Sequence, residues 1–172
     1  MPLVEELLNC LQGASVFSAL DMCSGYHQIK MDPNDSLKTA FAIRGGNYAF
    51  KVMPFGLRNA PATFQRCLEQ ILAPFLFKFV IVYCDDILVY SSNTEEHLQH
   101  LNSVFSSLRR QNCYIKISKC KFAMESLDYL GFIISENTLS KSPSKINAIL
   151  HASKTRTVKD VRSFLGILCF LP

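Results

Sequence analysis

The feature that most constrains this sequence is a pair of apolar runs joined by only two acidic residues. The runs are FVIVYC, which ends at Cys84, and ILVYS, which begins at Ile87, and both are rich in β-branched and aromatic side chains. Two such runs separated by two residues predict a β-hairpin. Asp85 and Asp86 are therefore expected to form its turn and to lie side by side at its tip.

An Asp-Asp turn has a simple explanation and a chemical one. Aspartate is a favoured turn residue, so a solvated loop tip is the simple explanation. Two carboxylates about 4 Å apart repel by about 4 kcal/mol at an effective dielectric of 20, and a cation would relieve that repulsion. Asp21 also ends an apolar run, FSALD, so a third carboxylate can join the pair where two strands end. Three such groups predict a site for hard divalent cations.

Strand geometry ranks the two neighbouring acids. Adjacent side chains in a strand point to opposite faces, so Asp85 and Asp86 are equally good ligands only if the turn rotates one of them. We therefore expect Asp85 to be the better ligand. Paired magnesium ions about 3.5 to 4 Å apart are typical of in-line phosphoryl transfer, which makes nucleotidyl transfer the predicted chemistry.

Periodicity in the rest of the chain predicts an α+β domain. Strand-like segments cover residues 15–22, a hairpin within 39–52, and residues 120–124 and 128–135. Helical segments cover residues 3–11, the segment capped by Asn59 with Pro61 in its first turn, the segment capped by Asn93 and Glu96, and residues 144–152 and 158–170. Because no repeat, low-complexity tract or linker interrupts them, we expect one domain.

The helix that follows Asn93 contains two histidines. Its apolar side chains, Leu98, Leu101, Phe105 and Leu108, form one face. His97 and His100 have i, i+3 spacing and could ligate a metal, but no third and fourth ligands lie nearby in the sequence. We therefore predict that both lie on a solvated helix face.

Composition favours a packed intracellular domain. Of the 172 residues, 49% are hydrophobic, and 18 Lys and Arg against 14 Asp and Glu give a net charge of +4, which suits a polyanionic partner without requiring one. Seven cysteines without a C-x-x-C pair indicate a reduced compartment rather than a zinc site. The N-terminus lacks a signal peptide's basic region, and the most apolar stretch, 71–84, is too short to span a membrane.

Four segments, in this order, resemble the palm motifs of reverse transcriptases: FSALDMCSGYHQI, MPFGLRNAPATFQ, VYCDDILVYS and LDYLGFIIS. The resemblance is to the gypsy class of long-terminal-repeat retrotransposons and covers roughly residues 3–170. It implies a palm fold, in which an antiparallel sheet carries helices on one face. It also implies a single partial domain over residues 1–172, with a palm core at about 14–135 and a helical connection at about 143–170. Fingers, thumb and RNase H are expected to be missing.

The resemblance also implies roles for individual residues. Asp21, Asp85 and Asp86 would be the catalytic carboxylates and would bind two Mg²⁺ or Mn²⁺ ions together with the backbone of Met22. Lys119 would be a general acid that protonates the pyrophosphate leaving group. The residues implied in nucleotide binding are Cys23, Gly25, Tyr26, Phe55 and Gly56, and those implied at the template and primer are Gln65, Tyr83, Cys84, Leu130 and Gly131.

Residue type alone favours simpler roles for several of these positions. Tyr26 matches the family's aromatic that lies under the incoming sugar and excludes a 2'-hydroxyl by its bulk, yet it can also be an ordinary half-buried tyrosine. Phe55 would otherwise be assigned to the core, Gln65 to the surface and Lys119 to an exposed strand. Cys84 occupies the variable position of the family's Tyr-x-Asp-Asp signature, where a larger apolar residue is more usual.

The implied function is RNA-directed DNA polymerisation within a Pol polyprotein. Its partners would be an RNA or DNA template with primer, deoxynucleoside triphosphates and other parts of the polyprotein, with no membrane. The expected location is intracellular, in the cytoplasm or a virus-like particle, or in the nucleus. An inactive remnant or domesticated nucleic-acid-binding protein is the alternative, and an unrelated α+β binding module is a third. Exposed apolar surface and self-association are expected where fingers and thumb would lie.

Overall fold

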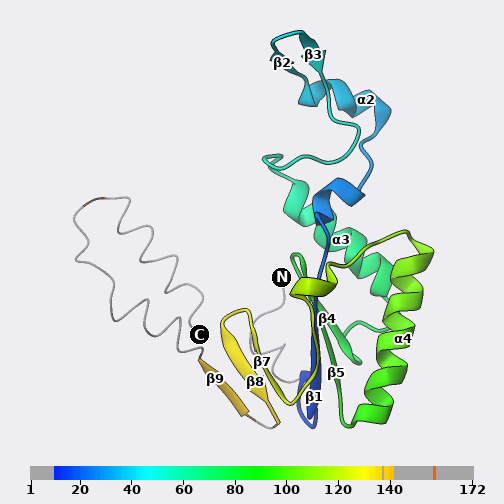
Figure 1. Cartoon of the computed structure of the whole chain (residues 1–172), viewed down its shortest axis with the longest axis vertical. Coiled ribbons are helices and arrows are strands. Elements are labelled where there is room, and N and C mark those ends of the chain that lie inside the picture. Colours follow the sequence, from blue (N-terminus) through cyan, green and yellow to red (C-terminus); the bar gives the residue numbers. More distant parts are fainter. Residues whose placement is uncertain (1–9, 137, 142–156, 158–172) are drawn as a thin grey trace.

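The computed structural model describes residues 10–136, 138–141 and 157 (Figure 1). The strands are β1 (Val16–Asp21), β2 (Phe41–Ile43), β3 (Gly46–Tyr48), β4 (Val80–Tyr83), β5 (Asp86–Ser91), β6 (Lys121–Met124), β7 (Ser126–Tyr129), β8 (Phe132–Ser135) and β9 (Thr138–Lys141). The helices are α2 (Pro33–Ser36), α3 (Ala60–Leu72) and α4 (Thr94–Arg110), with short 3₁₀ helices η1 (Gly25–Gln28), η2 (Leu37–Thr39) and η3 (Ile117–Lys119). The helices predicted over 3–11, 144–152 and 158–170 lie mostly or wholly outside the described residues.

A four-stranded antiparallel sheet, in the order β4-β5-β1-β6, forms the centre of the molecule. Helices α3 and α4 pack on one face of this sheet (Figure 1). The predicted α+β fold, an antiparallel sheet with helices on one face, is therefore confirmed.

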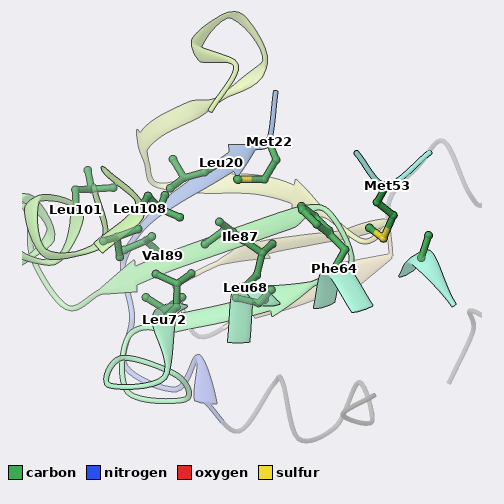
Figure 2. Close-up of a cluster of buried hydrophobic side chains, with 14 residues drawn as sticks. Leu20, Met22, Met53, Phe64, Leu68, Leu72, Ile87, Val89, Leu101 and Leu108 are labelled. Carbon is green, nitrogen blue, oxygen red and sulfur yellow. The ribbon is translucent and has the colours of Figure 1, made fainter. Parts of the chain in front are cut away.

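The helix-side face of the sheet carries the main hydrophobic core (Figure 2). Leu20, Ile87 and Val89 of the strands lie in one cluster with Phe64 and Leu68 of α3, and each is at most 2% exposed. These side chains recur at three- or four-residue spacing on the helix, which gives α3 an apolar face. Burying a side chain of this size contributes about 1.5–3 kcal/mol, so the core holds α3 firmly against the strands.

The other face of the central sheet packs against a second sheet, which has the order β7-β8-β9. Phe17 and Leu88 of the central sheet lie in one cluster with Leu127, Tyr129 and Ile134 of the β7–β8 hairpin. The central sheet is thus covered on both faces, by α3 and α4 on one and by the β7–β8 hairpin on the other.

The β4–β5 hairpin is confirmed, but its turn differs from the prediction. Tyr83 pairs with Asp86, so the turn consists of Cys84 and Asp85, and Asp86 is the first residue of β5. Cys84 has a left-handed backbone, with φ at 52°. Few non-glycine residues adopt this conformation, so residue type gives little sign of the turn's position.

The prediction of one strand over residues 128–135 is wrong. The segment contains the end of β7 and the whole of β8, and Tyr129 pairs with Phe132. Leu130 and Gly131 therefore form a turn, as the family resemblance implies. Apolar residues continue through the turn, which hides it from a pattern-based prediction.

The two predicted helix caps have different outcomes. The side chain of Asn93 accepts the Glu96 N–H at 2.9 Å, which confirms the cap of α4. Asn59 precedes α3 as predicted, but its side chain makes no capping hydrogen bond. Its backbone is already helical, with φ at −95° and ψ at −2°, whereas a capping side chain normally needs an extended backbone.

Both histidines of α4 were predicted to be solvated, and both predictions are wrong. His100 is half-buried, and its ring stacks on that of Phe79 with centroids 3.7 Å apart. His97 is 1% exposed, whereas Leu98, predicted on the apolar face, is 63% exposed. The ring of His97 exchanges hydrogen bonds with Ser18 of β1 at 2.6 Å and with Ser91 of β5 at 2.8 Å. The prediction failed because two serines on the facing strands satisfy the ring, and buried polar groups need such partners.

The predicted hairpin within residues 39–52 is confirmed, and it lies apart from the central sheet, at one end of the long axis of the molecule (Figure 1). Phe41 of β2 pairs with Tyr48 of β3, and their side chains are 42% and 50% exposed. In the described part of the chain, no helix has the length and apolar character needed to cross a membrane.

Candidate catalytic carboxylate site

Strands β1 and β5 bring two carboxylates together. Asp21 lies directly opposite Asp86 in the antiparallel register, which places both side chains on the same face of the sheet with Cβ atoms about 4.5–5.5 Å apart. Their neighbours Leu20 and Ile87 point into the helix-side core, so the two acids point to the other face. The two strand ends meet, as the sequence predicts.

Asp85 joins this pair from the turn, one residue before β5. Burial raises the pKa of Asp85, and the negative charge of Asp21 raises it further. Burial likewise raises the pKa of Asp86, followed by the charges of Asp21 and Asp85, while Lys119 lowers it. The three carboxyls therefore repel one another at a surface position, where Asp85 and Asp86 remain exposed to solvent, and a bound cation would relieve this repulsion.

Lys119 is the cation nearest to these acids in the structure. Its Nζ lies 3.5 Å from Oδ2 of Asp21, and its side chain is 58% exposed. The residue ends η3, so the simpler expectation of a lysine on an exposed strand is wrong. The backbone of Asp21 is also fixed from this side, because its C=O accepts the Lys116 N–H at 2.9 Å.

The donor set fits a hard divalent cation, because it consists of carboxylate oxygens. Across residues 10–136 and 138–141, no three His, Cys, Asp or Glu side chains are already grouped as a metal cage. Met22 has its side chain in the core, at 4% exposure. Met22 pairs with Ile115 in an antiparallel bridge. The two hydrogen bonds of this bridge are made by the Asp21 C=O and the Cys23 N–H, and not by the backbone of Met22.

Gln65 of α3 holds the backbone of the β4–β5 hairpin. Its Nε2 donates to the Val82 C=O at 2.9 Å and to Glu69 at 2.7 Å, and its Oε1 accepts the Cys84 N–H at 2.6 Å. The carboxamide thus ties α3 to the turn that carries Asp85. A template contact by Gln65 stays a prediction, since these atoms are engaged within the chain.

Tyr26 lies near the carboxylates and within an aromatic group. Burial raises its pKa, and the charges of Asp85 and then Cys84 raise it further. Its ring centroid is 5.1 Å from that of Phe55 and 5.4 Å from that of Phe64. The preceding Gly25 is needed for this packing, because a Cβ there would lie 2.5 Å from the ring of Phe64. This packing constraint is a reason for glycine that is independent of any nucleotide.

Other predicted nucleotide-site residues lie on the surface around Tyr26. Phe55 is 66% exposed, so its assignment to the core is wrong, and it also contacts the ring of His27. Gly56 follows with φ at 93°, a conformation that favours glycine. Cys23 is exposed, and its N–H donates to the Tyr114 C=O at 2.9 Å.

The β7–β8 hairpin lies against the carboxylate hairpin. The hydroxyl of Tyr129 is 3.4 Å from the backbone oxygen of Asp86, a long hydrogen bond. Tyr83 and Leu130 both pack against the cluster that joins the two sheets. The turn at Leu130 and Gly131 is therefore near the acids, and its place beside a primer stays a prediction.

Comparisons with known proteins decide the family. A family model described as reverse transcriptase (RNA-dependent DNA polymerase) matches residues 2–134. The chain belongs to the reverse transcriptase family. Its relatives include the Pol polyproteins of Drosophila melanogaster transposons 297, with 40% identity over 97% of the chain, and gypsy, with 39% identity over 99%. The chain spans 16% of the length of each of these two polyproteins.

Solved structures confirm the reverse transcriptase fold. A foamy viral protease-reverse transcriptase in complex with double-stranded DNA has a TM-score of 0.83 and 24% identity, over 96% of this chain and 29% of that one. The foamy viral protein in complex with RNA/DNA hybrid has a TM-score of 0.80 and 25% identity, over 95% of this chain and 22% of that one.

Two long-range contacts near the carboxylates could not be predicted from the sequence. Tyr129 reaches Asp86, 43 residues away, and the side chain of Gln28 reaches Tyr114, 86 residues away. Local periodicity carries no information about pairs so distant in the chain. Gln28 does lie in the first of the four motifs, and this position was the one sign in the sequence that it belongs near the carboxylates.

Proposed function

We propose that the chain is the carboxylate-bearing part of an RNA-directed DNA polymerase, which joins deoxynucleotides to a primer on a template. The observation that carries this proposal is the register that sets Asp21 opposite Asp86, beside Asp85, in a chain of the reverse transcriptase family. In the reaction, a primer hydroxyl bonds to the α-phosphorus of a triphosphate, the bond to pyrophosphate breaks, and the hydroxyl proton is released.

Asp21, Asp85 and Asp86 would hold two Mg²⁺ or Mn²⁺ ions, with the backbone of Met22 as a further donor. The mutual repulsion of the carboxyls supports this role, because it disfavours the ionised acids without a counter-charge. When bound, such ions activate the attacking hydroxyl and stabilise the leaving oxygen. The same three carboxylates would orient the site so that these two oxygens lie in line.

Tyr26 would select deoxynucleotides, with Cys23, Gly25, Phe55 and Gly56 around it. Support comes from its position, since the charge of Asp85 acts on the Tyr26 hydroxyl while the ring packs against Phe55 and Phe64. A ring held in this way cannot move aside for a 2'-hydroxyl without losing these contacts. Steric exclusion of that oxygen is therefore its expected role.

Lys119 would be the general acid for the leaving pyrophosphate. Its ammonium lies 3.5 Å from Asp21 and stays largely exposed, so it is available to a charged ligand. An ammonium group can donate a proton, which is what a general acid requires. As a cation binds the carboxylates, Lys119 would be released from Asp21.

The proposed partners are an RNA or DNA template with primer, deoxynucleoside triphosphates and other parts of a Pol polyprotein. Tyr83, Cys84, Leu130, Gly131 and, through its helix, Gln65 would lie on the template and primer side. Complexes of the foamy viral relatives with DNA and RNA/DNA hybrid support a nucleic-acid partner. The proposed location is the cytoplasm or a virus-like particle.

Primer extension tests this function. The purified chain is incubated with a primed RNA template, deoxynucleotides and Mg²⁺ or Mn²⁺, beside Asp85→Ala and a control, Glu125→Gln, which changes an exposed acid between β6 and β7. Extension by the wild type and the control, but not by Asp85→Ala, is the expected result. No extension by a folded chain would contradict autonomous polymerisation, and a primed-template binding assay would then test the nucleic-acid-binding alternative.

A further inference from the structure

The segment that follows Asp21 has little regular structure to hold it. Beyond β1, the Cys23 N–H donates to the Tyr114 C=O at 2.9 Å, and the Lys116 N–H donates to the Asp21 C=O at 2.9 Å. Ser24 then takes a left-handed backbone, with φ at 49°, and reverses the chain. These two backbone hydrogen bonds therefore hold the chain reversal at Ser24, which is followed two residues later by Tyr26.

The side chain of Gln28 extends this anchor with three hydrogen bonds. Its Nε2 donates to the Cys23 C=O at 2.6 Å and to the Tyr114 C=O at 2.9 Å. Its Oε1 accepts the Tyr114 N–H at 2.7 Å. By donating to and accepting from one residue, the carboxamide reproduces the pair of bonds that a neighbouring strand would make.

The Gln28 carboxamide has all three of its polar positions engaged, since both amide hydrogens and the oxygen have partners. The side chain also lines a cavity of about 420 Å³ between η1, α3 and the loop after α4. Truncating it would remove a hydrogen-bond partner from the Cys23 C=O and from both backbone groups of Tyr114, at positions that face solvent. The bonds that close the reversal would then compete with solvent.

We infer that Gln28 is a positioning residue for the nucleotide site. It acts through the backbone of Cys23 and Tyr114, and it holds the reversal that carries Tyr26, two residues before it. The corresponding contact on the other carboxylate segment is Gln65, which holds the Cys84 N–H. That Gln28 holds this backbone follows from its hydrogen bonds alone, whereas its effect on nucleotide selection rests on the proposed function.

The test uses the whole chain with Gln28→Ala and Gln28→Glu. The glutamate is nearly isosteric and can accept the Tyr114 N–H, but it lacks the two donors and faces two carbonyl oxygens. Gln70→Ala is the matched control, because Gln70 is an exposed glutamine that lines the same cavity. Amide hydrogen exchange of Tyr114 is measured first, followed by the ratio of ATP to dATP dissociation constants in the presence of Mn²⁺.

Gln28→Ala removes the acceptor of the Tyr114 N–H and is expected to exchange that amide roughly tenfold faster, as for loss of about one hydrogen bond. Gln28→Glu keeps the acceptor but loses both donors, so a smaller increase in exchange is expected. Both variants are expected to narrow the preference for dATP. Gln70→Ala should change neither. Unchanged exchange in both Gln28 variants would overturn the inference, and faster exchange with an unchanged ATP to dATP ratio would leave Gln28 a structural residue only. If the wild type bound neither nucleotide, the proposed function and the selection claim would fail, while exchange would still decide the backbone claim.

Discussion

Asp86 is the residue at which the stability of the fold and the proposed chemistry are in conflict. It faces Asp21 across the β1–β5 pair, and burial together with the charges of Asp21 and Asp85 raises its pKa from the ordinary 3.8, although Lys119 lowers it. A carboxyl whose pKa is raised on folding stabilises the fold below its unfolded pKa, and this contribution is lost as the pH rises through the folded pKa. At neutral pH the ionised acid therefore reduces stability.

Asp86→Asn is expected to raise the free energy of unfolding at neutral pH by about 0.2–1 kcal/mol, the range for cross-strand pairs. The gain should shrink below pH 3.8, where the wild-type carboxyl is also protonated. Thermal unfolding followed by circular dichroism at both pH values measures this difference, with Glu125→Gln as the control. A loss of stability at neutral pH would show that Asp86 is already stabilised by the protein.

At the scale of single elements, the sequence predicts strands and helices better than the turns between them. The alternating or β-branched runs of β1, β4 and β5 were found because burial imposes their pattern. The turns at Cys84 and Leu130 were missed by pattern because both place a non-glycine residue at positive φ inside an apolar run. The sequence could predict that the strand ends carrying Asp21 and Asp86 lie close together. It could not predict that the two residues are directly opposite, because that register depends on long-range strand pairing.

Helix α4 is joined to the central sheet by His97. The ring contacts Ser18 and Ser91, and burial followed by the charge of His100 lowers the pKa of His97 from the ordinary 6.5. Because the folded pKa is lowered, the stability linked to this ring is complete above pH 6.5 and declines as the pH falls toward the folded value. Glu96, also on α4, lies 3.9 Å from His100 and belongs to the same group of charges.

His97→Leu is expected to cost about 0.5–1.5 kcal/mol for each lost hydrogen bond, since Ser18 and Ser91 lose the ring but keep bonds to Ala123 and His100. It should also reduce the loss of stability that the wild type shows between neutral and mildly acidic pH. Urea unfolding at the two pH values measures both effects. A variant whose stability depends on pH as strongly as that of the wild type would show that His97 is not the source of the dependence.

The described part of the molecule exposes several large apolar side chains away from the central sheet. Exposed aromatic side chains include Phe41 and Tyr48 on the β2–β3 hairpin, whose rings stack with centroids 6.1 Å apart. A two-stranded hairpin is marginally stable by itself, and large exposed patches mark contact surfaces. A second copy of the chain could cover this surface.

The chain is therefore expected to self-associate as its concentration rises, and the double variant Phe41→Ser with Tyr48→Ser should weaken this association. Leu98→Ser is the control, because Leu98 is exposed on α4, outside the hairpin. Size-exclusion chromatography with light scattering gives the mass of each variant. A monodisperse wild-type monomer at high concentration would contradict the expectation.

The central claim is that Asp21, Asp85 and Asp86 form one cation site at the end of the central sheet. Titration of the chain with Mn²⁺, followed by the electron paramagnetic resonance signal of the free ion, tests it without requiring the other parts of a polyprotein. The account predicts saturable binding that Mg²⁺ displaces, that Glu125→Gln retains and that Asp21→Asn and Asp85→Asn lose. No saturable binding by the folded chain, or equal binding by the two aspartate variants, would contradict it.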